Sequence, residues 1–372
     1  MTKSRLIHKI NPTLIVFVTS LIFLIYHLSS NNWNPFSFIL IGGKFDPRVN
    51  NQSYGYDGQF AYQIAKDPLN AWRYVDVPAY RYQRILYPIL ARALSFGNPN
   101  FLPWMLIFIN WSSLLLSIYL LEKLLQKNFI NKWYALSYGL YQGVWVSLRL
   151  DLTEILAYLL VICGILAIEK KKIWYSSIFF ALALLAKEVT LIFIIPYFLS
   201  MLLNKKFLLS LKLLILIMTP FVIWQSILLI WFGEIGIRSG GLFSTPIEWI
   251  PYRGWWSFAR IHLLAFVLGS IPVLFTAILP SLLYLVVAIR DIYHKIWQPE
   301  VWILLFHGGL IAILPQSVIF DNLGLVRTVT GLVLALLVYG MKRNSSRSLN
   351  YSLLWIFSFL FILENQYLPN YP

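Results

Sequence analysis

The chain has 372 residues, of which 59% are hydrophobic and only 12% are charged, and its mean hydropathy is +0.69. This composition excludes a water-soluble globular domain, because too few polar residues are present to cover an apolar core. The formal net charge of +15 does not predict a nucleic-acid partner, because the lysines and arginines lie mostly in short gaps between apolar runs. We therefore predict an all-α, polytopic bundle of transmembrane helices that forms a single integral membrane domain over residues 1–372.

Apolar runs of about 20 residues can cross a bilayer as helices, and about eleven runs in this chain approach that length. They lie near residues 13–29, 101–121, 133–148, 152–168, 173–186, 189–203, 207–232, 261–289, 301–314, 328–340 and 351–363. Only Lys187 and Glu188 separate the run at 173–186 from the next run. These two runs could therefore form a broken or re-entrant pair of helices instead of two full spans.

The basic loops predict which ends of these spans share a side. A basic amino terminus precedes the first apolar run without a small-residue cleavage site, which predicts an uncleaved first helix with its amino end inside. Alternation then places the carboxyl terminus outside. It puts on the inner side the short basic segments 122–132, 169–172, 204–206, 290–295 and 342–347.

The outer side carries clusters of mixed sign instead. Ionisable groups at the ends of membrane spans are costly unless they pair or face a wet cavity, so these clusters predict one shared site on the outer face. The clusters are Asp57 with Arg81 and Arg84; Arg149 with Asp151 and Glu154; Lys187 with Glu188; Arg238 with Glu248, Arg253 and Arg260; and Asp321 with Arg327.

The first outer loop, residues 30–100, is expected to contain interfacial helices. Over residues 78–94 the apolar side chains follow helical spacing, and the arginines fall on a separate stripe. This pattern predicts a helix, kinked by Pro88, that lies in the membrane interface. Arg81 and Arg84 suit phosphate because a guanidinium group can bind it in a bidentate manner. Anchoring to lipid headgroups is the alternative interpretation of the same arginines.

Asp57 lies at the centre of the polar, aromatic stretch YGYDGQF in this loop. It directly precedes a helical pattern, so it could be a helix N-cap. It could equally be a general base or a substrate ligand, because Gly55, Gly58 and the flanking tyrosines indicate a tight, shaped loop. Asp46, Asp67 and Asp76 look like ordinary loop and turn residues, Asp67 especially because Pro68 follows it.

The remaining polar groups near the span ends give fewer indications. Asp151 and Glu154 are spaced to share a helix face, and a structural salt bridge between their cluster and the pair Lys187 and Glu188 is the alternative to a binding site. His262 and His307 lie in apolar runs and are expected to be hydrogen-bonded core residues. No spacing of His, Cys and carboxylates resembles a zinc site, and no phosphate-binding loop motif is present.

The order of these motifs resembles the GT-C superfamily of multispanning membrane glycosyltransferases. The resemblance covers about residues 1–200 and is carried by YGYDGQF, the basic helix YRYQRILYPILARAL, the acidic-basic pair in RLDLTE and the tip LLAKE. It is closest to bacterial membrane proteins of that group and more distant to the GPI mannosyltransferases. It implies an enzyme of the bacterial inner membrane with its active site on the extracytoplasmic face, involved in a cell-envelope glycan.

The resemblance further implies an inverting transferase that takes a sugar from a polyprenyl-phosphate carrier and passes it to a glycan, lipid or protein acceptor. The first-loop acid of the family, which acts as the general base, matches Asp57. The family often has two adjacent acids there, sometimes with a divalent metal. Gly58 stands at the second place, so the sequence itself requires no cation.

Developing charge on a leaving phosphate can be stabilised by cations at helix ends. The candidates for that role are Arg81, Arg84, Arg149, Lys187 and Arg327, and the acids expected beside them are Asp151, Glu154 and Glu188. Two other classes remain open. A flippase or polymerase of lipid-linked glycans would keep the interfacial arginines but would not need Asp57, whereas a secondary transporter would be expected to show a repeat between its halves.

Overall fold

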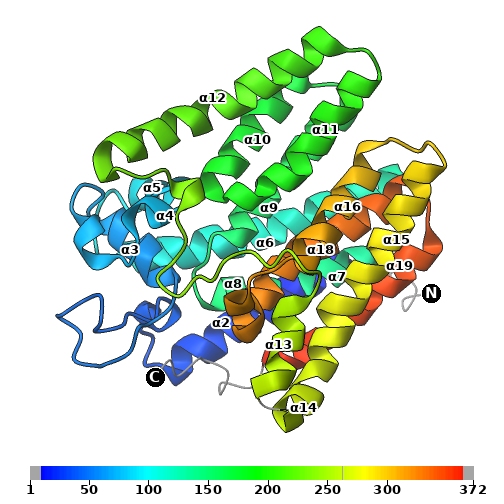
Figure 1. Cartoon of the computed structure of the whole chain (residues 1–372). Helices are drawn as coiled ribbons and strands as arrows, with labels where there is room; N and C mark the ends of the chain where they lie inside the picture. The colour runs from blue at the N-terminus through cyan, green and yellow to red at the C-terminus, as the bar shows by residue number, and fades with distance from the viewer. Residues whose placement is uncertain (1–9, 262, 363–372) are drawn as a thin grey trace, which may run out of the picture.

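The structure is a computed structural model that describes residues 10–261 and 263–362. All regular elements in these two ranges are helices, and they form an elongated bundle with a cluster of short helices at one end (Figure 1). This confirms the predicted all-α class for the described part of the chain.

The amino-terminal part contains one long helix followed by several short ones. Helix α2 begins at Pro12 because proline suits the first helical position, and the Asn11 side chain caps it by accepting a hydrogen bond from the Leu14 backbone N–H. The elements of this part are α2 (Pro12–Ser30), η1 (Pro35–Phe38), α3 (Gly58–Lys66), η2 (Ala71–Tyr74), α4 (Pro78–Tyr82) and α5 (Leu86–Leu94).

The middle of the chain supplies the long helices on which the polar cluster rests. Helices α9 and α10 form a hairpin, and α10 and α11 both pack against α12 (Figure 1). The elements are α6 (Leu102–Lys127), η3 (Lys132–Ala135), α7 (Leu136–Gly139), α8 (Gln142–Arg149), α9 (Glu154–Glu169), α10 (Ile173–Ala186), η4 (Glu188–Thr190), α11 (Leu191–Leu203) and α12 (Phe207–Phe232).

The carboxyl-terminal part places one buried helix at the centre of the bundle. Helix α18 packs against α8, α16 and α19. The elements are η5 (Gly236–Arg238), α13 (Arg253–Ile261), α14 (Leu263–Val273), η6 (Leu274–Ile278), α15 (Leu279–Tyr293), α16 (Pro299–Ala312), α17 (Gln316–Phe320), α18 (Asn322–Lys342), α19 (Ser346–Ser352) and η7 (Leu353–Ile362).

Among the described residues, five helical stretches are long and apolar enough to cross a membrane: Pro12–Ser30, Leu102–Lys127, Phe207–Phe232, Ser270–Tyr293 and Asn322–Lys342. Large apolar side chains are exposed along two of them, for example Ile22 at 61% and Ile230 at 86%. Surfaces of this kind are suited to lipid rather than water. Ile173–Ala186, Glu188–Leu203 and Pro299–Ala312 are apolar but shorter, so the structure does not establish the expected bundle of about eleven spans.

Two of the predicted helices are divided. The expected span at 133–148 consists of η3, α7 and α8: the helix type changes between Ala135 and Leu136, and the helix is interrupted at Leu140–Tyr141. The expected helix at 78–94 consists of α4 and α5, and Pro88 lies in the first turn of α5 instead of at a kink. Proline cannot donate to the carbonyl group four residues earlier, at Arg84, and the chain interrupts the helix around that residue.

Ion pairs join both ends of α9 to both ends of α18. Glu154 pairs with Arg327 at one end, and Glu169 pairs with Lys342 at the other. Residues 154–169 and 327–342 cover the same length of helix, about 22 Å. Lys127 also pairs with Glu169, and Thr13 donates to Glu122, so the start of α2 lies at the same end as the basic segments 122–132, 169–172 and 342–347.

Candidate functional site

The opposite end of the bundle contains a polar cavity of about 320 Å³. The first loop, the tip between α10 and α11, the segment between η5 and α13, and the start of α18 all contribute to it. Its ionisable residues are Asp57, Asp76, Arg81, Arg84, Glu154, Lys187, Glu188, Asp321 and Arg327. Seven of these, all except Asp76 and Asp321, belong to the residues that the sequence predicted as a site.

Asp57 is an anion held between two arginines and does not cap a helix. It occupies the N-cap position of α3, but its backbone is helical (φ −52°, ψ −29°) and its side chain makes no capping hydrogen bond, which overturns the N-cap interpretation. Nη1 of Arg81 and Nη1 of Arg327 donate to its two oxygens, each at 2.9 Å. Burial raises the pKa of Asp57, but the two guanidinium groups outweigh it and hold the pKa well below its usual range.

Arg81 also binds Asp76, which sequence reasoning placed among ordinary turn residues. Nε and Nη2 of Arg81 donate to the two Asp76 oxygens at 2.6 and 2.7 Å, a bidentate pair. The Leu242 backbone N–H donates to the same carboxylate at 3.1 Å. Asp76 therefore belongs to the site and ties the first loop to the segment between η5 and α13, which was not visible because residues 76 and 242 are far apart in the chain.

Glu154 joins α9 to two cations from other parts of the chain. Its side chain is fully buried, and Oε1 accepts hydrogen bonds from Nζ of Lys187 at 2.5 Å and Nε of Arg327 at 2.7 Å. A buried carboxylate is stable only when it is paired in this way. The predicted clusters around Glu154, Lys187 and Arg327 are thus one network with Asp57.

Arg84 pairs with the second acid at the α10–α11 tip. Its Nε and Nη2 donate to the two oxygens of Glu188 at 2.9 and 2.6 Å, and Nη2 also donates to the Tyr80 hydroxyl at 2.9 Å. The guanidinium groups of Arg81 and Arg84 thus face the protein cavity, since the carboxylates they bind line it. The anchoring of these two arginines to lipid headgroups is therefore not what their contacts show.

Asp321 lines the cavity on the side of α18, and the buried Tyr56 lies behind it. The Tyr56 hydroxyl donates to Oδ2 of Asp321 and accepts from Nη1 of Arg327, both at 3.1 Å. Oδ1 of Asp321 caps α18 by accepting from the Leu323 backbone N–H at 3.1 Å. Burial raises the pKa of Asp321, more than the Arg327 charge lowers it. Asp321 was recognised in the sequence only as the neighbour of Arg327.

Several donors in the cavity are left over after these pairs are formed. Among the described residues, Nη1 of Arg84 and Nη2 of Arg327 have no hydrogen-bond partner, and Lys187 uses its ammonium group only for Glu154. All three side chains line the cavity. They leave unshared donors for the oxygens of an anion, because guanidinium and ammonium groups donate but never accept.

Arg149 lies outside this cavity. Its Nη1 donates to the Ser37 backbone carbonyl at 2.7 Å, and its guanidinium group lies 5.7 Å from the Phe38 ring, so it clamps the first loop to α8. Burial lowers the pKa of Arg149 to about 10. The predicted phosphate-binding role of Arg149 does not agree with this placement.

Asp151 ends helix α8. Its φ of +50° is left-handed, a conformation that aspartate tolerates better than most residues, and the Leu152 N–H returns to the Ser147 carbonyl at 3.0 Å. Its side chain is fully buried beside a small cavity of about 30 Å³, which it lines together with Asp57, and burial raises its pKa well above the usual range. Asp151 is thus close to Asp57 but outside the main cavity.

Packing explains why glycine follows Asp57. A Cβ atom at position 58 would lie 2.1 Å from the Leu150 carbonyl oxygen, so a second acid cannot stand there without moving the backbone. In the described ranges no group of three or more His, Cys, Asp or Glu side chains is arranged to hold a metal ion. His307 is buried and hydrogen-bonded to the Ile303 carbonyl at 2.9 Å, which confirms it as a core residue, whereas His262 lies outside the described residues.

Comparison of the chain with models of protein families, with curated proteins and with solved structures finds no match.

Proposed function

We propose that this protein is an inverting glycosyltransferase that moves a sugar from a polyprenyl-phosphate carrier to an acceptor at the non-cytoplasmic membrane face. The observation that carries the proposal is the cavity itself. It combines unshared donors on Arg84, Lys187 and Arg327 with the carboxylates of Asp57 and Asp321, at the ends of apolar helices. A lipid-linked phosphate needs the donors, and an acceptor hydroxyl needs a carboxylate.

The depth of the cavity fits a lipid-linked donor. The ionic contacts at the two ends of α9 are about 22 Å apart, whereas the hydrocarbon core of a bilayer is about 30 Å thick. In this proposal one charged layer lies below the membrane surface, inside the protein, where the phosphate of a polyprenyl carrier can reach it. The cations are matched by carboxylates, so the phosphate is held by individual donors instead of by an excess of positive charge.

In this proposal Asp57 accepts the proton of the acceptor hydroxyl. The acceptor oxygen attacks the anomeric carbon, its proton passes to the carboxylate, and the bond from that carbon to the phosphate oxygen breaks with the electron pair leaving on the phosphate. Asp57 is a weak base while two guanidinium groups hold it, because proton transfer favours a base whose pKa is near the working pH. A donor phosphate that engages Arg327 draws one of these partners away and strengthens the base.

The test is transfer by purified protein in nanodiscs, using a panel of radiolabelled polyprenyl-phosphate hexoses and pentoses with membrane-extracted acceptors. We expect one donor to be consumed, and an Arg84→Gln variant to lose at least ten-fold in turnover. Arg73→Gln is the matched control, because Arg73 lies in the same loop but outside the cavity. Lipid-linked sugar that crosses the bilayer without transfer would replace this proposal with a flippase, and accumulation of a soluble substrate would replace it with a transporter.

A further inference from the structure

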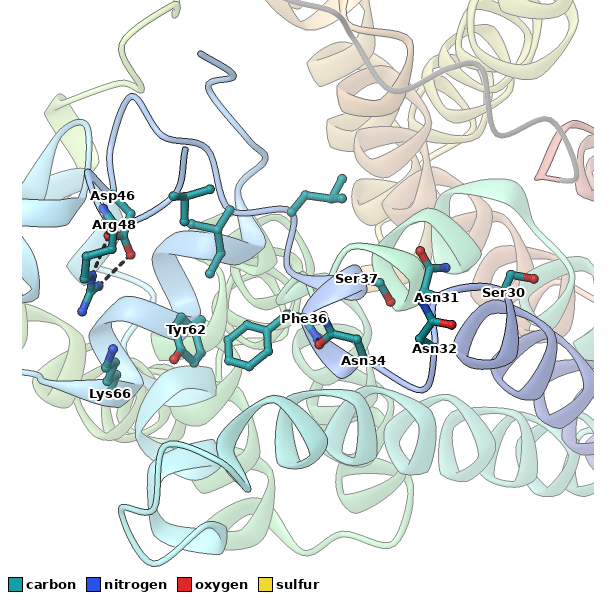
Figure 2. Close-up of a pocket in the computed structure, with 13 residues that line it drawn as sticks. Ser30, Asn31, Asn32, Asn34, Phe36, Ser37, Asp46, Arg48, Tyr62 and Lys66 are labelled. Carbon is teal, nitrogen blue, oxygen red and sulfur yellow. Dashed lines mark hydrogen bonds and ion pairs between the residues drawn. The ribbon is translucent and has the colours of Figure 1, made fainter. Parts of the chain in front are cut away.

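A second, larger cavity opens on the other side of the first loop. Its volume is about 730 Å³, within the range of ligand pockets in proteins. Its lining runs from the end of α2 at Ser30, past η1, to the side chains of Arg48 and Lys66 (Figure 2). None of its lining residues was predicted as a site, and none lines the cavity described above.

One end of this groove presents amide and hydroxyl groups (Figure 2). Oδ1 of Asn34 accepts from the Phe36 backbone N–H at 3.1 Å, which leaves its Nδ2 without a partner among the described residues. The Asn32 side chain is exposed and makes no hydrogen bond there, and the Ser37 hydroxyl is buried without a partner. The Ser37 hydroxyl lies in the lining of this end and keeps its hydrogen-bonding capacity unused among the described residues.

The other end of the groove is cationic. Arg48 uses Nε and Nη2 for Asp46, at 2.7 and 2.6 Å, and keeps Nη1 unshared within the described chain. The Lys66 ammonium group has no carboxylate partner there and lies 5.7 Å from the Tyr62 ring. Tyr62 and Phe36 form an edge-to-face pair between the two ends, with ring centroids 5.3 Å apart. The groove thus offers amides, an aromatic floor and then cations, in that order (Figure 2).

Helix α3 connects this groove to the first cavity. Asp57 precedes its first residue and Lys66 is its last, so the two sites lie about 14 Å apart along the helix. Gln59, on the same helix, fixes the intervening loop by accepting from the Gly42 N–H at 3.0 Å and donating to the Tyr54 carbonyl at 2.7 Å. A ligand longer than a single sugar could therefore occupy the groove and approach Asp57.

We propose that this groove binds an anionic carbohydrate chain. Its hydroxyl groups are bound by the side chains around Asn32, Asn34 and Ser37, one ring packs on Tyr62, and a phosphate or carboxylate group contacts Lys66 and Arg48. If the proposed transfer reaction holds, this carbohydrate chain is its acceptor. That assignment rests on the proposed function. A phospholipid headgroup has related chemistry, but its phosphate would lie near Ser30 at the end of α2, where none of the described residues that line the groove is cationic (Figure 2).

The experiment measures binding without any donor, so that it does not depend on transfer. The full chain in phosphatidylcholine nanodiscs is titrated with a hyaluronan tetrasaccharide, with neutral maltotetraose and with inorganic phosphate. We expect the anionic tetrasaccharide to bind at least ten-fold more tightly than the other two. Lys66→Gln should weaken it about ten-fold, and Asn34→Asp should weaken it too, because aspartate keeps the η1 cap but adds a negative charge.

Arg73→Gln is again the control and should bind like the wild-type protein, because Arg73 lies outside the groove. Equal binding by maltotetraose, or no effect of Lys66→Gln, would overturn the proposal. Binding of phosphate alone would reduce the site to an anion site and overturn the carbohydrate assignment. Competition by phosphatidylglycerol in the nanodisc would assign the groove to a lipid headgroup instead. Tetrasaccharide binding in this experiment, together with no consumption of any donor in the separate transfer assay, would refute the proposed enzyme and leave the groove standing.

Discussion

Two of the carboxylates that line the main cavity, Asp57 and Asp321, differ in their hydrogen-bond partners. Both oxygens of Asp57 accept from a guanidinium group, whereas Oδ2 of Asp321 accepts only from the Tyr56 hydroxyl. The pKa of Asp57 is accordingly lowered and that of Asp321 is raised. Either group could take a proton from an acceptor, so paired substitutions are needed to separate them.

We expect Asp57→Asn to fold and to lose turnover by at least about 100-fold, the size of a general-base contribution. Folding should survive because Arg81 still forms an ion pair with Asp76, and Arg327 with Glu154, when the charge at position 57 is removed. Asp321→Asn is the matched variant and should stay within about ten-fold of wild-type turnover, since asparagine also caps α18. Single-turnover assays compare the two variants. A large loss in Asp321→Asn with a small loss in Asp57→Asn would identify Asp321 as the base.

The buried Asp151 predicts a pH dependence of stability. Its pKa is raised in the folded protein above the usual value of 3.8, so the folded state holds its proton more tightly and stability falls as the pH rises above that value. Asp151→Asn removes this loss. Thermal unfolding in detergent should show that the stability of the variant relative to the wild type increases as the pH rises above the usual carboxyl pKa of 3.8, by at most ~1.4 kcal/mol per pH unit. A difference that stays constant with pH would show that Asp151 does not hold a proton.

At the scale of elements, the position of Asp57 in the first loop depends on close packing between α3 and the end of α8. The chain approaches so closely at Gly58 that a Cβ atom there would lie 2.1 Å from a backbone oxygen, which no side-chain movement can relieve. The same turn holds Asp151 in its left-handed conformation. Together these contacts fix Asp57 relative to α9 and α18.

Gly58→Ala should therefore destabilise the protein by about 1–3 kcal/mol and reduce turnover by displacing Asp57. Gly309→Ala in α16 is the control, because a Cβ atom there meets nothing within 4 Å. It should be neutral or stabilise by up to about 1 kcal/mol, since alanine is the better helix former. Unfolding midpoints and turnover of both variants check this, and a harmless Gly58→Ala would contradict the packing argument.

At the scale of the whole molecule, charge separates the two ends of the bundle. The basic segments gather with Glu169 and Glu122 at one end, and the mixed-sign cavity occupies the other. Positively charged loops favour the cytoplasmic side, which would place the cavity outside. The structure shows the separation of the ends, and labelling can assign them to the two faces.

Single cysteines at two exposed positions, in a Cys163→Ser background, make that assignment. Asn98 lies before α6 and Lys171 lies between α9 and α10, at opposite ends of the bundle. A membrane-impermeant maleimide added to intact cells should label Asn98→Cys, and should label Lys171→Cys only after permeabilisation. Labelling of Lys171→Cys from outside would move the cavity to the cytoplasmic face and exclude a donor displayed on the outer surface.

The sequence by itself determined the helical class, the apolar character of the long helices and seven ionisable residues of the cavity. The physical reason is the cost of unpaired charge beside hydrocarbon, which makes Asp57, Glu154 and Arg327 conspicuous wherever they fall in the chain. Such residues can be found from composition and spacing alone.

Only the tertiary structure decided how these charges pair, because pairing joins side chains that are far apart in sequence, such as Asp57 and Arg327. For the same reason Asp76 looked like an ordinary turn residue, whereas Arg149, which was predicted to bind phosphate, lies outside the cavity and donates to the Ser37 carbonyl. The groove between Ser30 and Lys66 was equally invisible, because its amides and cations carry no periodic pattern and meet only when the first loop folds over α3.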